Sequence, residues 1–381
     1  MYNGQTPSRN KSEYWNGTIK WLSSGELNRG TVYDSIETIT EEGQKAANLK
    51  IVPKGTFVMA ITGLEAAGTR GNCALLGFDT TLNQSCMALF PKQEMLTSEF
   101  LFQWYRKVGE EYGINYTQGT KQQSYNAELI KILPISLPSV VEQRKISSYL
   151  SHLDHLITLH QRKCEQTKNL KKYMLQKMFP KNGAKVPEIR FDGFTYDWEQ
   201  RKLGDLVNRI TRKNQDLVSE LPLTISAQYG LIDQNEFFDK RVASKDVSGY
   251  YLIENGEFAY NKSTSTDAPW GAIKRLDRYE NGVLSTLYIV FGIKENNLVD
   301  SDFLVSYYST NLWHKDIHEI AAEGARNHGL LNIAPADFFE TKLMIPQDIE
   351  EQKKIGKYFE ELDRLITLHQ RQHKLHLNML L

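Results

Sequence analysis

The chain has 381 residues, enough for two domains that each bury a core of their own. Hydrophobic residues make up 40% of it and charged residues 24%, as in an ordinary globular protein. No apolar run approaches the roughly 18 residues that a membrane span needs, and the first residues do not form a signal peptide. The three cysteines lie far apart, which argues against a disulfide framework and against a zinc cluster. We therefore expect a cytoplasmic protein without membrane contact.

The distribution of charged residues along the chain is more informative than the net charge. The 46 basic and 46 acidic side chains give a formal net charge of zero, whereas nucleic-acid binders usually carry a basic excess. Residues 1–140 hold 13 of each kind and residues 191–381 hold 22 basic and 29 acidic side chains. Residues 141–190, by contrast, hold 11 basic and 4 acidic side chains. Any contact with DNA must therefore come from local basic patches.

In chain order, the patterns predict short strands, a few helices and two long helical segments. An alternating apolar run at 57–61 is typical of a strand, and residues 98–108 favour a helix. A long helix follows from about 142 to 179, and a linker with Pro and Gly leads to a second globular segment. That segment contains an alternating run at 283–291, a helix at 301–310 and a second long helix at 350–381. Each globular segment is interpreted as α+β.

An internal repeat determines the architecture. Residues 142–162 match residues 351–371 at 14 of 21 positions, including an unbroken Leu-Ile-Thr-Leu-His-Gln-Arg block. Upstream the likeness weakens but persists, since Gly55–Met59 parallels Gly256–Tyr260. A period this long is a duplication of domains and not a solenoid of short repeats. The chain is therefore two half-units, each a variable globular segment followed by a nearly identical helix.

The two long helices carry an irregular coiled-coil stripe. Apolar or small residues recur at spacings of three and four, which predicts a seam that needs a partner helix. In the first helix the stripe is Leu153, Ile157, His160, Cys164, Thr167, Leu170, Met174 and Met178. In the second it is Leu362, Ile366, His369, His373, His376 and Leu380. We predict that the two helices pack against each other, antiparallel.

Signatures of catalysis are missing from the sequence. It has no phosphate-binding glycine loop, no G-x-G-x-x-G after a strand, and no Asn-Pro-Pro or Asp-Pro-Pro run of an amino-methyltransferase. His369, His373 and His376 share one helical face with spacing that could hold zinc. The aligned residues of the first copy are His160, Cys164 and Thr167, on the same seam, so we interpret the histidines as register-setting residues and predict no metal site. The chain is interpreted as a binder.

Polar, glycine-containing loops supply the candidate DNA contacts, because they combine the side chains that bind phosphates and base edges. In the first globular segment the candidates are Thr6, Arg9, Asn10, Lys11, Arg70, Asn72, Gln118, Thr120, Lys121, Gln122, Gln123 and Ser124. In the second they are Arg212, Lys213, Asn214, Asn261, Lys262, Lys274, Arg275, Arg326, Asn327 and His328. The loops at 118–124 and 324–329 occupy the same place in both repeats, which favours them over the others.

The doubled pattern resembles a known family. A Gly-Thr loop, an Asn, a Pro and a Glu-Gln-Arg-Lys-Ile block stand before the first long helix, and Gly-Ala, Asn, Pro and Glu-Gln-Lys-Lys-Ile stand before the second. This doubled pattern resembles the specificity subunits of Type I restriction–modification enzymes. Gly4–Ser8 and Trp198–Asp205 also look like the openings of their two recognition domains. The resemblance covers nearly the whole chain.

The resemblance implies two target-recognition domains that each read half of a bipartite, asymmetric site in double-stranded DNA, separated by two antiparallel helices. Its boundaries would be 1–140 for the first domain, 141–180 for the first conserved helix, 181–345 for the linker and second domain, and 346–381 for the second helix. It further implies docking of two modification (methyltransferase) subunits and of restriction (motor-nuclease) subunits. S-adenosylmethionine, ATP and Mg would then belong to those partners and not to this non-catalytic chain. The docking residues on the helices would be Glu142, Gln143, Arg144, Lys145, Glu351, Gln352, Lys353 and Lys354.

Two departures from the family pattern stand out. The first half-unit has no counterpart of the Trp198–Gly204 lead, so we expect its opening residues to be missing. The last helix ends at Leu381, aligned with Lys172 and short of the first copy's Phe179, so we expect it to be truncated.

Three alternatives remain open at this stage. A divergent nuclease–methyltransferase would need motifs that the sequence does not show. A coiled-coil adaptor that binds only protein leaves unexplained why the globular segments differ while their helices match. The chain could also be the specificity subunit of another multi-subunit restriction–modification class.

Overall fold

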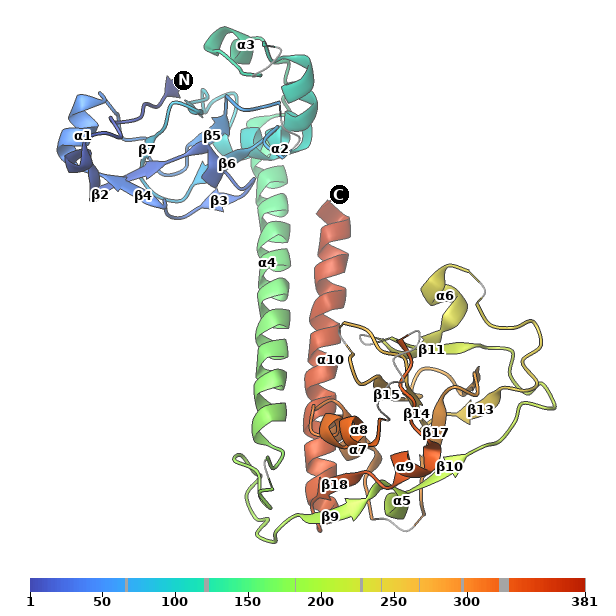
Figure 1. The fold of residues 1–381 in the computed structure, drawn as a ribbon. Coiled ribbons are helices and arrows are strands. Elements are labelled where there is room, and N and C mark those ends of the chain that lie inside the picture. Colours follow the sequence, from blue (N-terminus) through green and yellow to red (C-terminus); the bar gives the residue numbers. More distant parts are fainter. Residues whose placement is uncertain are drawn as a thin grey trace. The chain divides into compact units, whose positions relative to one another are not determined.

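The chain folds as two compact units. The computed structural model describes residues 1–65, 68–119, 123–181, 183–226, 229–240, 242–266, 268–295, 298–321 and 329–380. The first unit is Met1–Thr158 with Lys374–Leu381, and the second is Leu159–His373. Both mix strands and helices (Figure 1), which confirms the predicted α+β class.

The first unit is built on a mixed sheet in the order β1-β8-β5-β6-β3, with a smaller sheet in the order β4-β2-β7. Its strands are β1 (Tyr2–Asn3), β2 (Trp15–Leu22), β3 (Thr31–Val32), β4 (Glu37–Ile39), β5 (Phe57–Ala60), β6 (Cys73–Leu76), β7 (Thr81–Leu82) and β8 (Cys86–Leu89). Its helices are α1 (Glu41–Ala46), α2 (Ser98–Asn115) and α3 (Ala127–Lys131), with 3-10 turns η1 (Ser12–Tyr14) and η2 (Ser24–Glu26). α4 (Val140–Lys177) begins in this unit.

The second unit has its main sheet in the order β10-β17-β14-β15, and the pairs β11-β12, β13-β16 and β18-β9. Its strands are β9 (Glu199–Lys202), β10 (Val207–Ile210), β11 (Leu223–Ser226), β12 (Gly230–Asp233), β13 (Tyr251–Glu254), β14 (Phe258–Asn261), β15 (Ala272–Arg275), β16 (Asn281–Leu284), β17 (Ile289–Ile293) and β18 (Lys342–Ile345). Its helices are α5 (Leu203–Leu206), α6 (Gln234–Phe238), α7 (Ser301–Tyr308), α8 (His314–Ile320), α9 (Pro335–Phe339) and α10 (Ile349–Leu380).

The predicted strand at 283–291 is two strands. β16 ends at Leu284 and β17 begins at Ile289, with a turn between them in which the Tyr288 N–H donates to the Ser285 carbonyl. The alternating pattern continues through the turn because Leu287 is apolar, yet that side chain is 54% exposed. The two strands join different sheets, so the turn transfers the chain from one sheet to the other.

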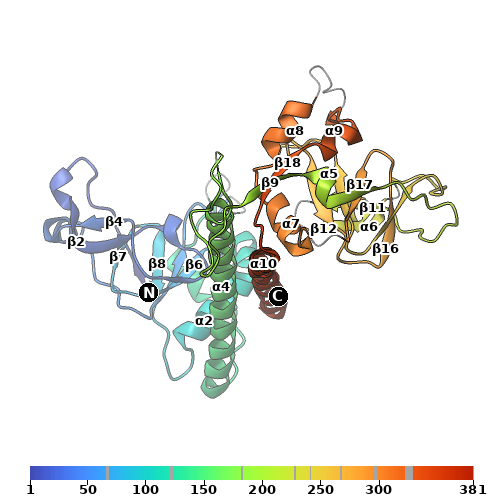
Figure 2. The ribbon, with the colours of Figure 1, turned by 90° about the horizontal axis from the view of Figure 1, so that it is seen from below.

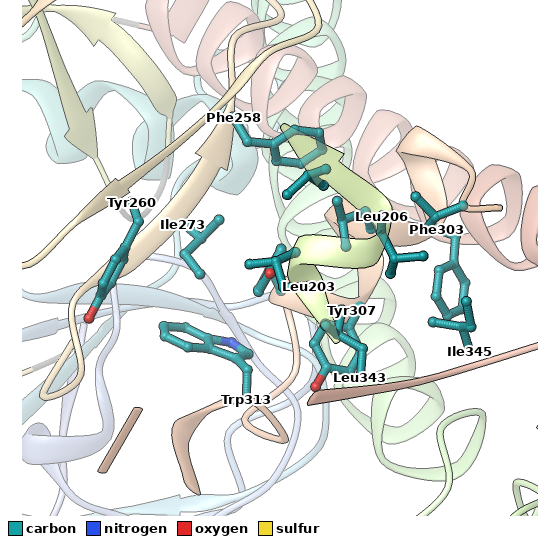
Figure 3. Packing of buried hydrophobic residues seen from close by; sticks show 14 of the residues in the cluster. Leu203, Leu206, Phe258, Tyr260, Ile273, Phe303, Tyr307, Trp313, Leu343 and Ile345 are labelled. Carbon is teal, nitrogen blue, oxygen red and sulfur yellow. The ribbon is translucent and has the colours of Figure 1, made fainter. Parts of the chain in front are cut away.

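Each unit has its own apolar core. In the first unit the core lies between the main sheet and α2, around Phe57, Phe102 and Tyr105. In the second unit α5 inserts its leucines among the aromatic side chains of β14, α7 and α9, as Figure 3 shows for Leu203 and Leu206. Both leucines are fully buried. Two separate cores explain why the globular segments could diverge independently.

Within the second unit, α4 and α10 lie side by side (Figures 1 and 2) and antiparallel. The Nδ1 atoms of His160 and His369 lie 3.1 Å apart, and Lys171 pairs with Asp363 at 2.6 Å, so residue numbers rise along one helix and fall along the other. The predicted antiparallel pairing is confirmed. The prediction that Leu170 belongs to the seam is wrong, since its side chain is 45% exposed. The neighbouring Lys171 contacts α10 instead, through its ion pair with Asp363. His160 and His369 are equivalent in the repeat, so a local two-fold axis passes between them.

One buried glutamine fixes each long helix to its globular unit. In the first unit the Gln143 side chain donates to the Met95 and Pro138 carbonyls at 2.8 and 2.9 Å and accepts from the Thr97 N–H at 3.0 Å. Thr97 is the N-cap of α2. The same amide therefore satisfies backbone groups on three sides of the helix start.

The second unit repeats this network. Gln352 donates to the Leu298 and Pro346 carbonyls at 3.1 and 2.9 Å and accepts at 2.8 Å from the N–H of Asp300, the N-cap of α7. Gln143 and Gln352 are 0% and 1% exposed. The Gln that both helix blocks share is thus explained by its place inside each unit.

Substitution of either glutamine by alanine should destabilise its own unit. Gln143→Ala leaves the buried Thr97 N–H and two carbonyls without their partner, which costs about 1–3 kcal/mol. Hydrogen exchange should show faster opening of 97–115 for Gln143→Ala and of 300–308 for Gln352→Ala. The exposed neighbour Arg144→Ala serves as the control and should change stability by less than about 0.5 kcal/mol. Equal protection in all variants would contradict the role of the glutamines.

Candidate nucleic-acid interface

The second unit contains a wide groove of about 1140 Å³ beside α4. α4, α10, β15 and the segment between α7 and α8 contribute to its walls. Its cationic lining residues are Lys168, Lys171, Lys172, Lys181, Lys274, Arg275 and Arg278, and its acidic ones are Asp277 and Asp363. Hydrogen-bonding side chains such as Gln176, Asn311 and Gln370 lie among them. A groove with this excess of cations is suited to a polyanion.

Helical spacing brings the α4 cations together. Lys168, Lys171 and Lys172 are three and four residues apart, so they share one side of the helix near its C-terminal end. Within the described part of the chain, Lys168, Lys172 and Lys181 form no ion pair with a carboxylate, and all three are exposed. Their charges are therefore available to phosphates.

Lys171 and Lys274 share one carboxylate. The Lys171 ammonium lies 2.6 and 2.7 Å from the two oxygens of Asp363. Burial lowers the pKa of Lys274, the nearby Lys171 lowers it further, and Asp363 opposes the shift. An anion in the groove would stabilise the charged form of Lys274.

The charge of Arg275 is already paired with carboxylates of the protein. Its guanidinium lies 2.6 Å from Asp277 and 2.7 Å from Asp302, and it donates to the Ser301 hydroxyl at 2.7 Å. Burial opposes its charge, but the two carboxylates raise its pKa. This side chain ties β15 to the start of α7 and forms part of the wall.

In the first unit the candidates near the N-terminus make local contacts. Arg9 lies over the Trp15 ring at 3.7 Å and pairs with Glu37 at 2.5 Å, and Lys11 donates to the Tyr14 hydroxyl at 3.0 Å. Thr6 bonds to the side chain of Gln84, and Asn10 is exposed. The group forms an exposed polar surface stiffened by aromatic rings.

The other first-unit candidates gather around the loop after β5. The Arg70 guanidinium donates to the Leu64 and Glu65 carbonyls at 2.9 Å, which is a structural use of the side chain. Asn72 accepts a bond from Arg29 at 3.4 Å. Gln118 and Ser124 pair through their backbones, and the Gln123 N–H donates to Glu65 at 3.2 Å. Thr120, Lys121 and Gln122 lie outside the described residues.

The second-unit candidates outside the groove are spread over several loops and the end of β14. Arg212 pairs with Glu257 at 3.0 Å, and Lys213 lies over the Tyr251 ring at 4.1 Å. Asn261 accepts from the Ser263 N–H at 3.0 Å, and burial lowers the pKa of Lys262. Arg326, Asn327 and His328 lie outside the described residues.

Asn214 is a structural residue. It is fully buried, donates to the Ser219 carbonyl at 2.8 Å and accepts from the Ser219 N–H at 3.1 Å. Both ends of its amide are used to close the 214–219 loop. A buried side chain in this position offers nothing to DNA, so we remove it from the candidate contacts.

The expected docking residues divide into buried and exposed ones. Gln143, Glu351 and Gln352 are buried, and Glu351 binds the Arg190 guanidinium at 2.7 and 2.8 Å. A partner cannot reach them. The residues that remain on the surface are Glu142, Arg144, Lys145, Lys353 and Lys354.

Sequence reasoning missed most of the groove. It selected Lys274 and Arg275 but not Lys168, Lys171, Lys172, Lys181 or Arg278. The signal was present in the basic excess of residues 141–190, from which no individual contact residue was predicted. Neither a metal cluster of three or more His, Cys, Asp or Glu side chains nor a helix apolar and long enough to cross a membrane occurs among the residues that the structure describes.

Comparison with known proteins gives two matches along the chain to one family. Residues 2–169 and 196–378 each match the family described as Type I restriction modification DNA specificity domain. The chain belongs to this family. The two matches correspond to the two halves of the internal repeat.

Relatives and solved structures agree with this. The chain is 30% identical over 218 residues to the Type I restriction enzyme MjaIX specificity subunit of Methanocaldococcus jannaschii, covering 54% of this chain and 48% of that protein. It is 28% identical over 161 residues to the EcoR124I/EcoR124II specificity subunit of Escherichia coli, covering 41% and 38%. The chain thus spans about half or less of the curated relatives it matches. The S subunit of a Type-I restriction-modification system from M. genitalium shares the fold, with a TM-score of 0.57 and 13% identity over 100% of this chain and 90% of that one.

Neutralising the groove should weaken DNA binding without changing sequence preference. In Lys168→Gln/Lys172→Gln, affinity should fall evenly over all duplexes, and the slope of log K against log salt should flatten by about 0.9 for each lost phosphate contact. Fluorescence anisotropy at several salt concentrations measures both. Lys163→Gln, an exposed lysine of α4 outside the groove, is the matched control. An equal loss in the control would show that only the overall charge matters.

Proposed function

We propose that this chain is the DNA-recognition subunit of a Type I restriction–modification complex, without catalytic activity of its own. The observation that carries the proposal is the double match to a DNA specificity domain on a chain whose second unit holds a cation-lined groove. A duplicated reader fits a bipartite target, because each copy can diverge toward its own half-site while the shared helix is preserved. The unequal halves make that target asymmetric.

The proposed division assigns residues 1–140 and 181–345 to the two target-recognition domains and residues 141–180 and 346–381 to the conserved helices. Phosphate contacts come from the groove and set the position of the duplex, whereas base contacts come from loop side chains. The exposed loop candidates of the first domain are Arg9, Asn10 and Lys11. The loops at 118–124 and 324–329 remain candidates because they are equivalent in the repeat.

The partner surfaces are proposed on the exposed start of each conserved helix. Arg144 and Lys145 on α4 correspond to Lys353 and Lys354 on α10, and all four are exposed. Two equivalent basic surfaces are what two copies of one modification subunit require. Motor-nuclease subunits complete the assembly. S-adenosylmethionine, ATP and Mg²⁺ are assigned to these partners.

Methylation should appear only on assembly. The purified chain should not turn over S-adenosylmethionine, whereas the chain with a modification subunit should methylate a duplex that contains its target. Sequencing-based detection of methylated adenines in the source cell identifies that target. Turnover by the isolated chain would overturn the assignment as a reader, and methylation by the modification subunit alone would make this chain unnecessary.

Arg326 tests base recognition in the second domain. If it reads a base, Arg326→Ala should cost about 1–3 kcal/mol and relax preference in one half-site only. If it binds only phosphate, the affinity should fall for all duplexes alike and the salt dependence should flatten. Binding of the assembled variant to duplexes altered in one half-site at a time separates these outcomes. Unchanged affinity on every duplex would exclude Arg326 from the interface.

A further inference from the structure

The two long helices carry an aspartate at the same position of the repeat. Asp154 of α4 and Asp363 of α10 each follow a buried leucine in the shared helix block. In the first unit both oxygens of Asp154 accept from the Arg106 guanidinium of α2, at 2.5 and 3.1 Å. The aspartate thus ties the long helix to the helix that packs on the sheet of its own unit.

The second unit has a serine in place of this arginine. Counting from Thr97 and Asp300, the N-caps of α2 and α7, places Ser309 in the position of Arg106. Both caps are followed by Ser, an acidic residue, Phe and Leu, which supports the alignment. Ser309 lines the cationic groove. Because its side chain is too short to make the contact that Arg106 makes, Asp363 has a different partner.

A strand residue also differs between the two units. Val58 and Ala259 correspond in the repeat, and their cross-strand partners are Ala74 and Lys274. Ala74 is fully buried in the first core, whereas Lys274 is half-buried and lines the groove. Asp363 opposes the lowering of the Lys274 pKa by burial, so the two charges interact. The second unit has therefore lost an arginine that bound the aspartate and gained a lysine near it.

Asp363 pairs with a cation of the opposite helix. The Lys171 ammonium lies 2.6 and 2.7 Å from its two oxygens. In the repeat Lys171 corresponds to Leu380, so that position offers no cation for an equivalent pair with Asp154. The side chain of Asp363 is 53% exposed, against 32% for Asp154. The carboxylate is therefore accessible to a ligand in the groove.

A carboxylate and a backbone phosphate make the same interaction with an ammonium group. Each carries one negative charge and presents two oxygens that accept charge-assisted hydrogen bonds. A partly exposed ion pair contributes little to stability, so exchanging one anion for the other requires little free energy. Asp363 thus has the charge and the contacts that a phosphate at Lys171 needs.

We propose that Asp363 occupies a phosphate subsite of the groove and that a backbone phosphate of DNA replaces it at Lys171. The inference rests on the proposed function, since the ligand is a duplex bound in the groove. Because Asp363 must release Lys171 first, DNA of any sequence gains less from the groove. The aspartate therefore limits retention on DNA that offers phosphates but no matching bases.

The exchange has a consequence for salt dependence. A lysine that is unpaired when DNA arrives releases condensed counterions, which adds about 0.9 to the slope of log K against log salt. At Lys171 this release is offset, because Asp363 becomes unpaired and attracts a cation in turn. The contact therefore adds almost nothing to the slope while Asp363 is present.

Asp363→Asn tests the exchange, because the amide keeps the shape of the side chain and an oxygen for Lys171 but removes the charge. Affinity for a random-sequence duplex at low salt should rise about two- to fivefold, as for the loss of one partly exposed ion pair. The slope of log K against log salt should steepen by about 0.9. Asp154→Asn removes the same charge at the equivalent position outside the groove and should change neither quantity. Fluorescence anisotropy with a labelled duplex measures both.

Unchanged or lower affinity of Asp363→Asn overturns the proposal, and so does an equal gain in Asp154→Asn, which would reflect net charge alone. If the wild-type chain binds no duplex, the proposed function fails and this inference with it. If it binds and the two variants behave like it, only this inference fails.

A zero-length carbodiimide crosslink tests the exchange in the wild-type chain. The reagent joins Lys171 to Asp363 as an amide while the two groups are in contact, and peptide mass spectrometry measures the yield. Saturating duplex should reduce this yield severalfold. The Lys202–Glu340 crosslink, from an ion pair of 2.7 Å outside the groove, is the control and should persist. A Lys171–Asp363 yield that DNA leaves unchanged, or that falls only in parallel with the control, overturns the proposal.

Discussion

The architecture depends on a single side-chain amide used twice. Gln143 and Gln352 each bind the N-cap of one helix, the residues before that cap and the proline segment that leads into the long helix. A buried amide destabilises the fold unless all of its donors and acceptors form hydrogen bonds. Each glutamine therefore holds the three segments together as one unit. The direction in which each long helix leaves its globular unit follows from this. The near-identity of the helix block in both copies has this internal reason, since each copy needs the same buried glutamine.

A chain of zero net charge can still hold a polyanion, because its charges are segregated. The end of α4 and strand β15, together with Lys181 and Arg278, which follow them in the chain, bring seven cations to one groove, while the excess of carboxylates lies elsewhere in residues 191–381. Within the groove the roles differ. Arg275 is neutralised by Asp277 and Asp302 and shapes the wall, whereas Lys274 is half-buried and its charge is opposed by Lys171 and favoured by Asp363. Groove position and pairing, more than residue type, decide which cation is available to phosphate.

The repeat and the helical periodicity predicted the fold well, because the repeat appears when the sequence is aligned with itself and the periodicity is a property of nearby residues. The α+β class, the two long helices and their antiparallel pairing followed from the block that contains His160 and His369. Pairing of distant residues was harder to foresee. Nothing in the local sequence marks Asn214 as the closure of a buried loop, or Gln143 as internal when Arg144 beside it is exposed. We predicted DNA contacts in polar loops, because such loops stand out in the sequence. The groove instead includes helix and strand residues that only the tertiary fold brings together.

The contact between His160 and His369 has a consequence for the symmetry of the seam. Two equivalent residues meet at the local axis with their Nδ1 atoms 3.1 Å apart. A hydrogen bond between two imidazole nitrogens needs one donor and one acceptor, so the rings must differ in their tautomer or charge. A symmetric pair of helices is thus joined by an asymmetric hydrogen bond. Between two neutral rings the bond has two forms, which differ in the helix whose Nδ1 donates, and each ring keeps one N–H and changes tautomer when the donor changes. The energies of the two forms differ only because the surroundings do, with Cys164 one turn from His160 where His373 lies one turn from His369. The duplication made the two helices alike, and the direction of one hydrogen bond distinguishes them.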